Sequence, residues 1–240
     1  MAHRREQKEA LRREREQREA ETRAAAQRKR LVGYGSAGAI AVVAIVLIVV
    51  LAAGGGGGAA GGSQGGGDVF PEGGEVSEQT EFDIEAAARA AGCELEASEG
   101  TGVLSHTTSL DERVEYEDNP PTNGRHYEIP AEDGLYQESP ADEALVHTLE
   151  HGRVIVWAKP SMPRDARETL RALFDEDDYQ MVMVPRRNMP YAVAATAWNG
   201  DPQPGGTGRT LGCDEWSPEV VDAIRTFRDE HRSNGPEPVP

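Results

Sequence analysis

Four of the chain's six histidines lie in segments where imidazole side chains could share a metal ion. His147 and His151 stand four residues apart in a segment with helical periodicity, so both rings project from one helix face, one turn apart. His126 ends the turn-forming segment Asn119–His126, and His106 lies upstream in a strand-like run. Neutral imidazole binds zinc, copper, nickel and iron. We therefore predict a metal site on these four histidines, with copper or zinc as the ion.

A methionine could complete this site, because a thioether ligand favours copper. Met189 lies in a loop between Asn188 and Pro190 and is a further candidate ligand. Met181 and Met183 share one face of an apolar strand, so we expect them in the core.

Two other interpretations of the histidines remain open. The segment His147–His151 fits the pattern H-x-x-E-H, in which two histidines hold zinc and the glutamate activates water. Glu150 would then be the catalytic base of a metal-dependent hydrolase, although three fixed positions often match by chance. Alternatively, the histidines are structural and hold the Pro120-Pro121 loop against the helix. The protein would then be a non-catalytic envelope interaction module.

The elements that must position these residues mix helices and strands without strict alternation. Ser139-Pro140 and Ser217-Pro218 are helix-start signals, because serine caps a helix and proline suits its first turn. We expect helices over 82–91, 139–151, 163–174 and 217–231, and strands over 102–108, 112–116, 153–158, 180–184 and 191–198. This order predicts a single α+β domain with a small, mainly antiparallel sheet and three or four helices.

The chain has two cysteines, Cys93 and Cys213. On the oxidising side of a membrane we expect them to form a disulfide. The alternative is that both thiolates are metal ligands.

The first 67 residues predict a membrane anchor. Residues 1–30 form a basic arm with eleven Lys/Arg and six Glu, and residues 31–53 are uncharged and apolar, long enough for one transmembrane helix. Residues 54–67 hold ten glycines and predict a flexible linker. The arm places the N-terminus in the cytoplasm, so 68–240 is an extracytoplasmic domain of a single-pass plasma-membrane protein. A cleaved signal peptide is the alternative for 31–53.

Charge restricts the partners of each part. The chain carries −17 and the arm +5, so the outer domain carries −22. This acidity argues against nucleic acid as a ligand of the outer domain. The bilayer is the expected partner of 31–53, and anionic inner-leaflet lipid is a candidate partner of the arm. The sequence identifies no protein partner.

Four segments resemble a family of uncharacterised bacterial proteins known as domain of unknown function 3105. They are Asn119–His126, Leu145–Gly152, Met189–Trp198 and Leu211–Cys213. The likeness covers roughly residues 90 to 240 and implies a single-pass membrane protein with this outer domain. It brings no established activity.

The resemblance also bears on individual positions. The family has a histidine at the place of His106. It usually has Ser at the place of Asn123 and Pro at the place of Arg125, and both differences fall in the turn. The function we predict is a membrane-anchored extracytoplasmic domain that binds or handles a transition metal at a histidine-lined site.

Overall fold

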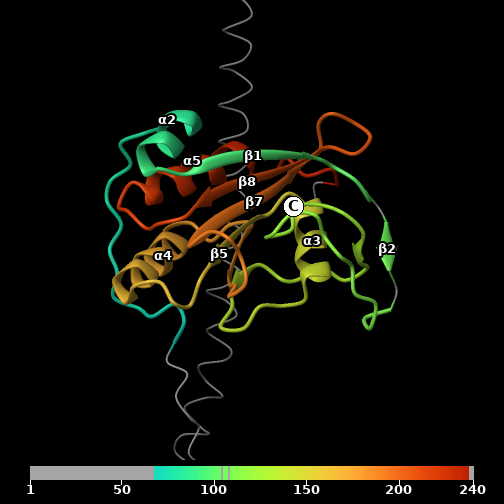
Figure 1. Ribbon diagram of the computed structural model, residues 1–240, viewed down its shortest axis with the longest axis horizontal. Coiled ribbons are helices and arrows are strands. Elements are labelled where there is room, and N and C mark those ends of the chain that lie inside the picture. The colour runs from blue at the N-terminus through green and yellow to red at the C-terminus, as the bar shows by residue number, and fades with distance from the viewer. Residues whose placement is uncertain (1–67, 104, 108, 238–240) are drawn as a thin grey trace, which may run out of the picture. The chain divides into compact units, whose positions relative to one another are not determined.

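The computed structural model describes residues 68–103, 105–107 and 109–237 (Figure 1). The predicted basic arm (1–30), transmembrane helix (31–53) and glycine linker (54–67) lie outside the described residues and stay predictions. Within the described ranges, none of the helices combines the length and the apolar character that a membrane crossing requires.

The described residues form four helices and eight strands, which confirms the α+β class. The helices are α2 (Ile84–Ala91), α3 (Asp142–Glu150), α4 (Arg164–Glu176) and α5 (Val220–His231). The strands are β1 (Glu94–Glu99), β2 (His106–Thr107), β3 (His126–Tyr127), β4 (Gly134–Leu135), β5 (Val154–Ala158), β6 (Met181–Pro185), β7 (Val193–Asn199) and β8 (Thr207–Cys213).

Six strands form one sheet in the order β1-β8-β7-β5-β6-β4. The pairings from β1 to β5 are antiparallel, whereas β6 pairs in parallel with both β5 and β4. The sheet is therefore mixed, whereas we expected a mainly antiparallel sheet. The parallel part arises because α4 connects β5 to β6, so that the two strands run side by side in the same direction. Strands β2 and β3 form a separate parallel pair.

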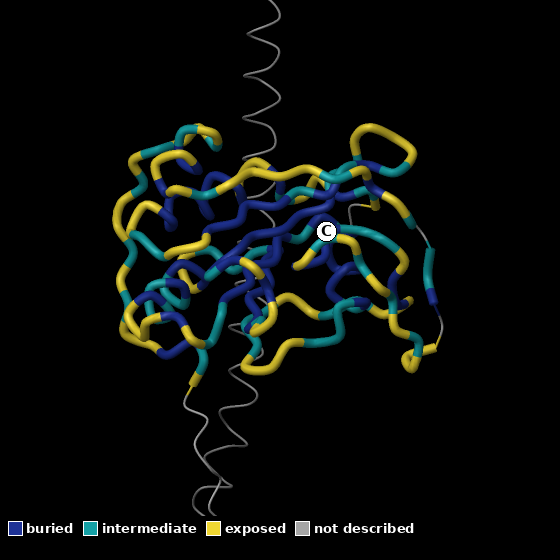
Figure 2. The backbone as a smooth tube through the Cα atoms, in the orientation of Figure 1, coloured by how far each residue is buried: buried dark blue, intermediate teal, exposed yellow. Residues whose placement is uncertain are grey.

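Strand alternation divides the core into two clusters, one on each face of the sheet. Val154 and Val156 of β5 pack in a first hydrophobic cluster with apolar residues of α2, α4 and α5. Ile155 and Trp157 pack in a second cluster with apolar residues of α3. Strands β5, β6 and β7 are buried almost throughout, whereas the edge strand β1 is largely exposed (Figure 2). The predicted core methionines, Met181 and Met183, are fully buried in the first cluster.

Several expected boundaries are wrong. No strand forms at 112–116, and the strand expected over 102–108 is reduced to His106–Thr107. Strands β1 and β8 were not expected, because Glu94–Glu99 is largely polar and Thr207–Cys213 contains two glycines. Here the sheet supplies ladder partners that intrinsic strand propensity does not predict.

The start of α3 also differs from the expectation. Ser139 does not cap this helix, and its hydroxyl donates instead to the carbonyl oxygen of Pro140. The helix begins at Asp142, whose carboxylate forms a bidentate ion pair with Arg186 at 2.7 and 3.0 Å. An acidic first turn stabilises the helix through its dipole, so α3 forms without the serine cap.

Cys93 and Cys213 form a disulfide, as the sequence predicts. Cys93 follows α2, and Cys213 ends β8, so the bond ties the first helix of the described domain to the sheet. Cys213 is part of the first hydrophobic cluster, and Cys93 packs against it. Because both cysteines are in the disulfide, neither is available as a thiolate metal ligand.

Loss of this cross-link should destabilise the domain. The bond closes a loop with a sequence separation of 120 residues. Chain-entropy arguments assign such a loop roughly 5 kcal/mol of unfolding free energy. The double variant Cys93→Ala/Cys213→Ala, compared with wild type by denaturant unfolding, should lose a large part of this amount. Equal unfolding midpoints would contradict a stabilising role.

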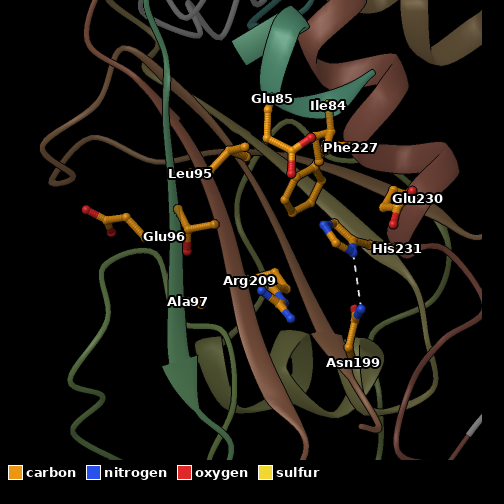
Figure 3. A pocket seen from close by; sticks show the side chains of 11 residues that line it. Ile84, Glu85, Leu95, Glu96, Ala97, Asn199, Arg209, Phe227, Glu230 and His231 are labelled. Atoms are coloured by element: carbon orange, nitrogen blue, oxygen red, sulfur yellow. Dashed lines mark hydrogen bonds between the residues drawn. The ribbon is translucent and has the colours of Figure 1, made fainter. Parts of the chain in front are cut away.

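Stability should also fall in mild acid because of His231 at the end of α5. Burial, followed by the charge of Arg209, lowers the pKa of His231 to about 4. The ring is neutral when folded and accepts a hydrogen bond at Nδ1 from the amide of Asn199 (Figure 3). In the unfolded chain this histidine has an ordinary pKa near 6.5. Between about pH 4 and pH 6.5 the unfolded chain therefore binds more protons than the folded protein does.

The unfolding free energy should therefore decrease as the pH falls from about 6.5 to about 4, by up to roughly 3 kcal/mol from this residue. Urea unfolding at pH 7.5 and pH 4.5 measures the change. His231→Gln keeps a neutral polar group and should reduce the loss. The same pH dependence in wild type and His231→Gln would contradict the assignment.

Candidate metal centre

Three short elements bring the candidate ligands together. His147 and Glu150 lie on the last turns of α3, His126 opens β3, and His106 opens β2. His106 and His126 are directly paired across the two-stranded ladder. The predicted helix face of His147 meets this ladder, since its Nδ1 lies 2.6 Å from the carbonyl oxygen of Tyr127.

The loop that carries His126 is held in place by polar contacts and close backbone packing. The Asn119 amide donates to the carbonyl oxygen of Asn188, and the Tyr116 hydroxyl donates to that of Arg125. Gly124 has a φ of 125°, a conformation that favours glycine. A Cβ on Gly102 would lie 2.6 Å from the backbone of Gly124, so the two loop segments approach as closely as glycine permits.

The side chains of His106, His126, His147 and Glu150 form a group whose potential ligand atoms all lie within 4.8 Å of one another. The three imidazole centroids are 4.8 to 4.9 Å apart. Glu150 Oε2 lies 3.0 Å from His126 Nε2 and 3.7 Å from His106 Nε2. This group could hold a metal ion.

The group is buried except at one corner. The side chains of His126 and Glu150 have no exposed surface, and that of His106 is 29% exposed. His147 is also buried. Solvent therefore reaches the cluster from the side of His106.

Backbone carbonyls set the proton positions on two of the rings. His126 Nδ1 lies 2.7 Å from the carbonyl oxygen of Gly124, and His147 Nδ1 contacts Tyr127 in the same way. A carbonyl oxygen only accepts, so each Nδ1 carries the proton and each Nε2 of a neutral ring carries a lone pair. Histidines that bind metals commonly donate their other N–H to a carbonyl or carboxylate in this manner.

His147 stays neutral over most of the pH range. Burial lowers its pKa to about 4, and the hydrogen bond to Tyr127 opposes this only in part. A neutral ring is the form that binds a metal. The pKa of the neighbouring His151 is also lowered, mainly by burial and to a lesser extent by the positive charge of Arg153.

The structure places His151 beside the group and not within it. Its Nε2 lies 3.0 Å from His147 Nε2, and it forms a second acidic group with Glu150 and Glu237. Glu237 arrives because the C-terminal segment docks on α3, where its N–H donates to the carbonyl oxygen of Glu150 at 3.0 Å. Gly152, with a φ of 83°, allows this approach, since a Cβ there would lie 2.9 Å from the nitrogen of Gly235.

Met189 and Glu150, the two remaining predicted site residues, have different surroundings. Met189 is buried in the second hydrophobic cluster, where packing accounts for its thioether. Glu150 lies among the histidines, which suits a ligand better than a base that must reach a water molecule. Sequence reasoning did not identify Glu237 or the two carbonyl acceptors. No local pattern marks them, because they come from segments distant in the chain.

Comparison with known proteins identifies the family. The family model described as a protein of unknown function, DUF3105, matches residues 107–240, and the chain belongs to this family. Cys93 and His106 lie before the matched residues. No match was found among curated proteins or among solved structures.

The tautomers can be tested in metal-free protein by long-range ¹H–¹⁵N NMR. At pH 7, His126 and His147 should carry their proton on Nδ1, and His147 should titrate near pH 4 because burial disfavours its charged form. His231 is the internal control, since the Asn199 amide donates to its Nδ1 and requires the proton on Nε2. A His147 ring that titrates near pH 6.5, or carries its proton on Nε2, would contradict this geometry.

Proposed function

We propose that this family member binds one divalent transition-metal ion, zinc in the first instance, on His106, His126, His147 and Glu150. The main support for this proposal is the distance of 3.0 Å between His126 Nε2 and Glu150 Oε2, two atoms of fully buried side chains. With Nδ1 protonated, the neutral ring presents a lone pair to a buried carboxylate oxygen. Two electron-rich atoms at this distance repel each other unless a cation lies between or beside them.

A proton shared between His126 and Glu150 is the competing explanation. It would require a well-directed N–H···O hydrogen bond, but the ring nitrogens His126 Nε2 and His106 Nε2 have no hydrogen-bond partner among the described residues. Both atoms are buried, and both point towards the same carboxylate. Convergence without hydrogen-bond geometry is the arrangement expected of ligands around one ion.

The donor set favours zinc. Three imidazole nitrogens and one carboxylate oxygen suit a borderline divalent ion, and four protein ligands complete a tetrahedral zinc site. The argument for copper depended on Met189 as a thioether ligand. Met189 packs in the second hydrophobic cluster, so this argument no longer applies. With all four positions filled by protein, the site suits binding, storage or transfer of the ion more than hydrolysis, which keeps a position open for water.

The location of the site outside the cytoplasm is part of the proposal. The Cys93–Cys213 disulfide supports it, because such bonds persist in oxidising compartments. The uncharged residues 31–53, preceded by a basic arm, support a single-pass anchor with the N-terminus in the cytoplasm. The arm could then contact anionic lipid of the inner leaflet.

Metal content tests the proposal. Full-length protein, purified in detergent from a host that exports it, should contain close to one zinc per chain by elemental analysis. Loss of a direct ligand should weaken zinc binding by more than about 100-fold, beyond the range seen for outer-shell partners. We expect this for His126→Ala and for Glu150→Gln, which keeps the shape of the side chain and removes its charge.

His231→Gln is the matched control, since it replaces a buried histidine outside the ligand group and should leave zinc content unchanged at pH 7.5. Circular dichroism of each variant verifies that the fold persists. Copper binds most nitrogen and oxygen sites more tightly in vitro, so native metal content, not competition, decides between the two ions. The proposal fails if wild type neither contains nor binds zinc or copper, or if His126→Ala binds as wild type does.

A further inference from the structure

A cavity of about 440 Å³ lies between strands β1 and β8 and helices α2 and α5 (Figure 3). The cavity lies on the face of the sheet that carries the first hydrophobic cluster, whereas the histidine group lies on the other face. Ile84, Leu95 and Phe227 form an apolar wall, and Asn199, Arg209 and His231 add polar groups. Its volume lies in the range of small-molecule sites, which combine apolar walls with a few polar groups.

Arg209 occupies a position that strand alternation assigns to the interior. Leu211 and Cys213, two and four residues further along β8, are buried in the first cluster, so Arg209 faces the same side. Its partners on the neighbouring strands are Ala97 and Ala197. Two methyl side chains beside a long one leave open space, which explains why the cavity forms above Arg209.

Arg209 is half-buried and forms no ion pair with a described residue. Its Nε is buried and has no hydrogen-bond partner among the described residues. By contrast, the buried Arg225 pairs with Glu176 and Asp222. A buried polar atom without a partner is unfavourable for folding. The rest of the half-buried guanidinium lines the cavity, where a ligand carboxylate would supply acceptors.

Asn199 shows the complementary feature. Its amide nitrogen donates to His231, but its Oδ1 is buried and has no hydrogen-bond partner among the described residues. Burial, with the charge of Arg209, keeps His231 neutral. The cavity therefore offers a cationic donor at Arg209 beside a neutral His231.

Two carboxylates also line the cavity. Glu85 comes from α2 and Glu230 from α5, and Figure 3 shows both on the helix side of the cavity, whereas Glu96 points away from it. Negative charge on one side and a cation on the other match a ligand that carries both signs.

We propose that this cavity binds an apolar amino acid as a zwitterion. The ligand carboxylate pairs with Arg209, whose planar fork matches a carboxylate. The ligand ammonium is attracted by Glu85 and Glu230, and the ligand side chain contacts the apolar wall. This site is separate from the metal site, and neither depends on the other.

Isothermal titration calorimetry of the full-length protein tests the proposal with three related probes. L-Leucine should bind with a Kd of about 1 mM or tighter. L-Leucinamide lacks the carboxylate, and N-acetyl-L-leucine lacks the ammonium and resembles a peptide C-terminus. Each should bind at least ten-fold more weakly. Absence of saturable L-leucine binding would overturn the proposal, as would equal binding of N-acetyl-L-leucine, which would indicate a peptide ligand instead.

Arg209→Met keeps the length of the side chain and removes its charge. It should abolish L-leucine binding without lowering the melting temperature, because it removes a half-buried charge that no described carboxylate pairs with. Arg187→Met, at an exposed arginine, is the control and should bind as wild type does. If Arg209→Met binds L-leucine normally, the cavity is not the binding site. If it melts well below wild type, Arg209 has a structural partner and the argument from its unpaired guanidinium is wrong.

Discussion

A carboxylate buried among three imidazoles is the constraint on which the rest of this domain depends. Glu150 has no exposed side-chain surface, and removal of a charge from water is unfavourable unless other charges or dipoles compensate. The Nε2 atoms of His106 and His126 face this carboxylate. A divalent cation at this point would compensate the carboxylate and use the lone pairs of the rings in one interaction.

The surrounding chain has the features needed to hold such a group. Two carbonyl groups orient His126 and His147, and both belong to the segment around β3. Close backbone contacts at Gly102, Gly124 and Gly152 bring the loops and the C-terminal segment against the end of α3. Rigid backbone positioning of this kind matters because metal ligands must stay close to their final geometry.

The end of β7 lies between the two candidate sites. Trp198 faces the histidine group, with its ring 6.0 Å from that of His126 and edge-on to it, and its indole N–H donates to the carbonyl oxygen of Gly205. The next residue, Asn199, faces the cavity that contains Arg209. Successive residues of a strand point to opposite faces, so one strand end lines two sites of different chemistry.

The α+β class, the disulfide and the inward-facing methionines could be predicted from the sequence, which also predicted a site on four histidines, three of which the structure brings together. These depend on local periodicity, residue type and pairing of only two cysteines, which a linear pattern records. Only the fold shows that Glu150 joins His106, His126 and His147, while His151 lies beside His147 and Met189 enters the core. It also decided that Arg209 faces a cavity, because the polar strands β1 and β8 exist through ladder partners and not through their own propensity. The physical reason is the same in each case: burial and convergence depend on which segments pack together, and those segments are far apart in the chain.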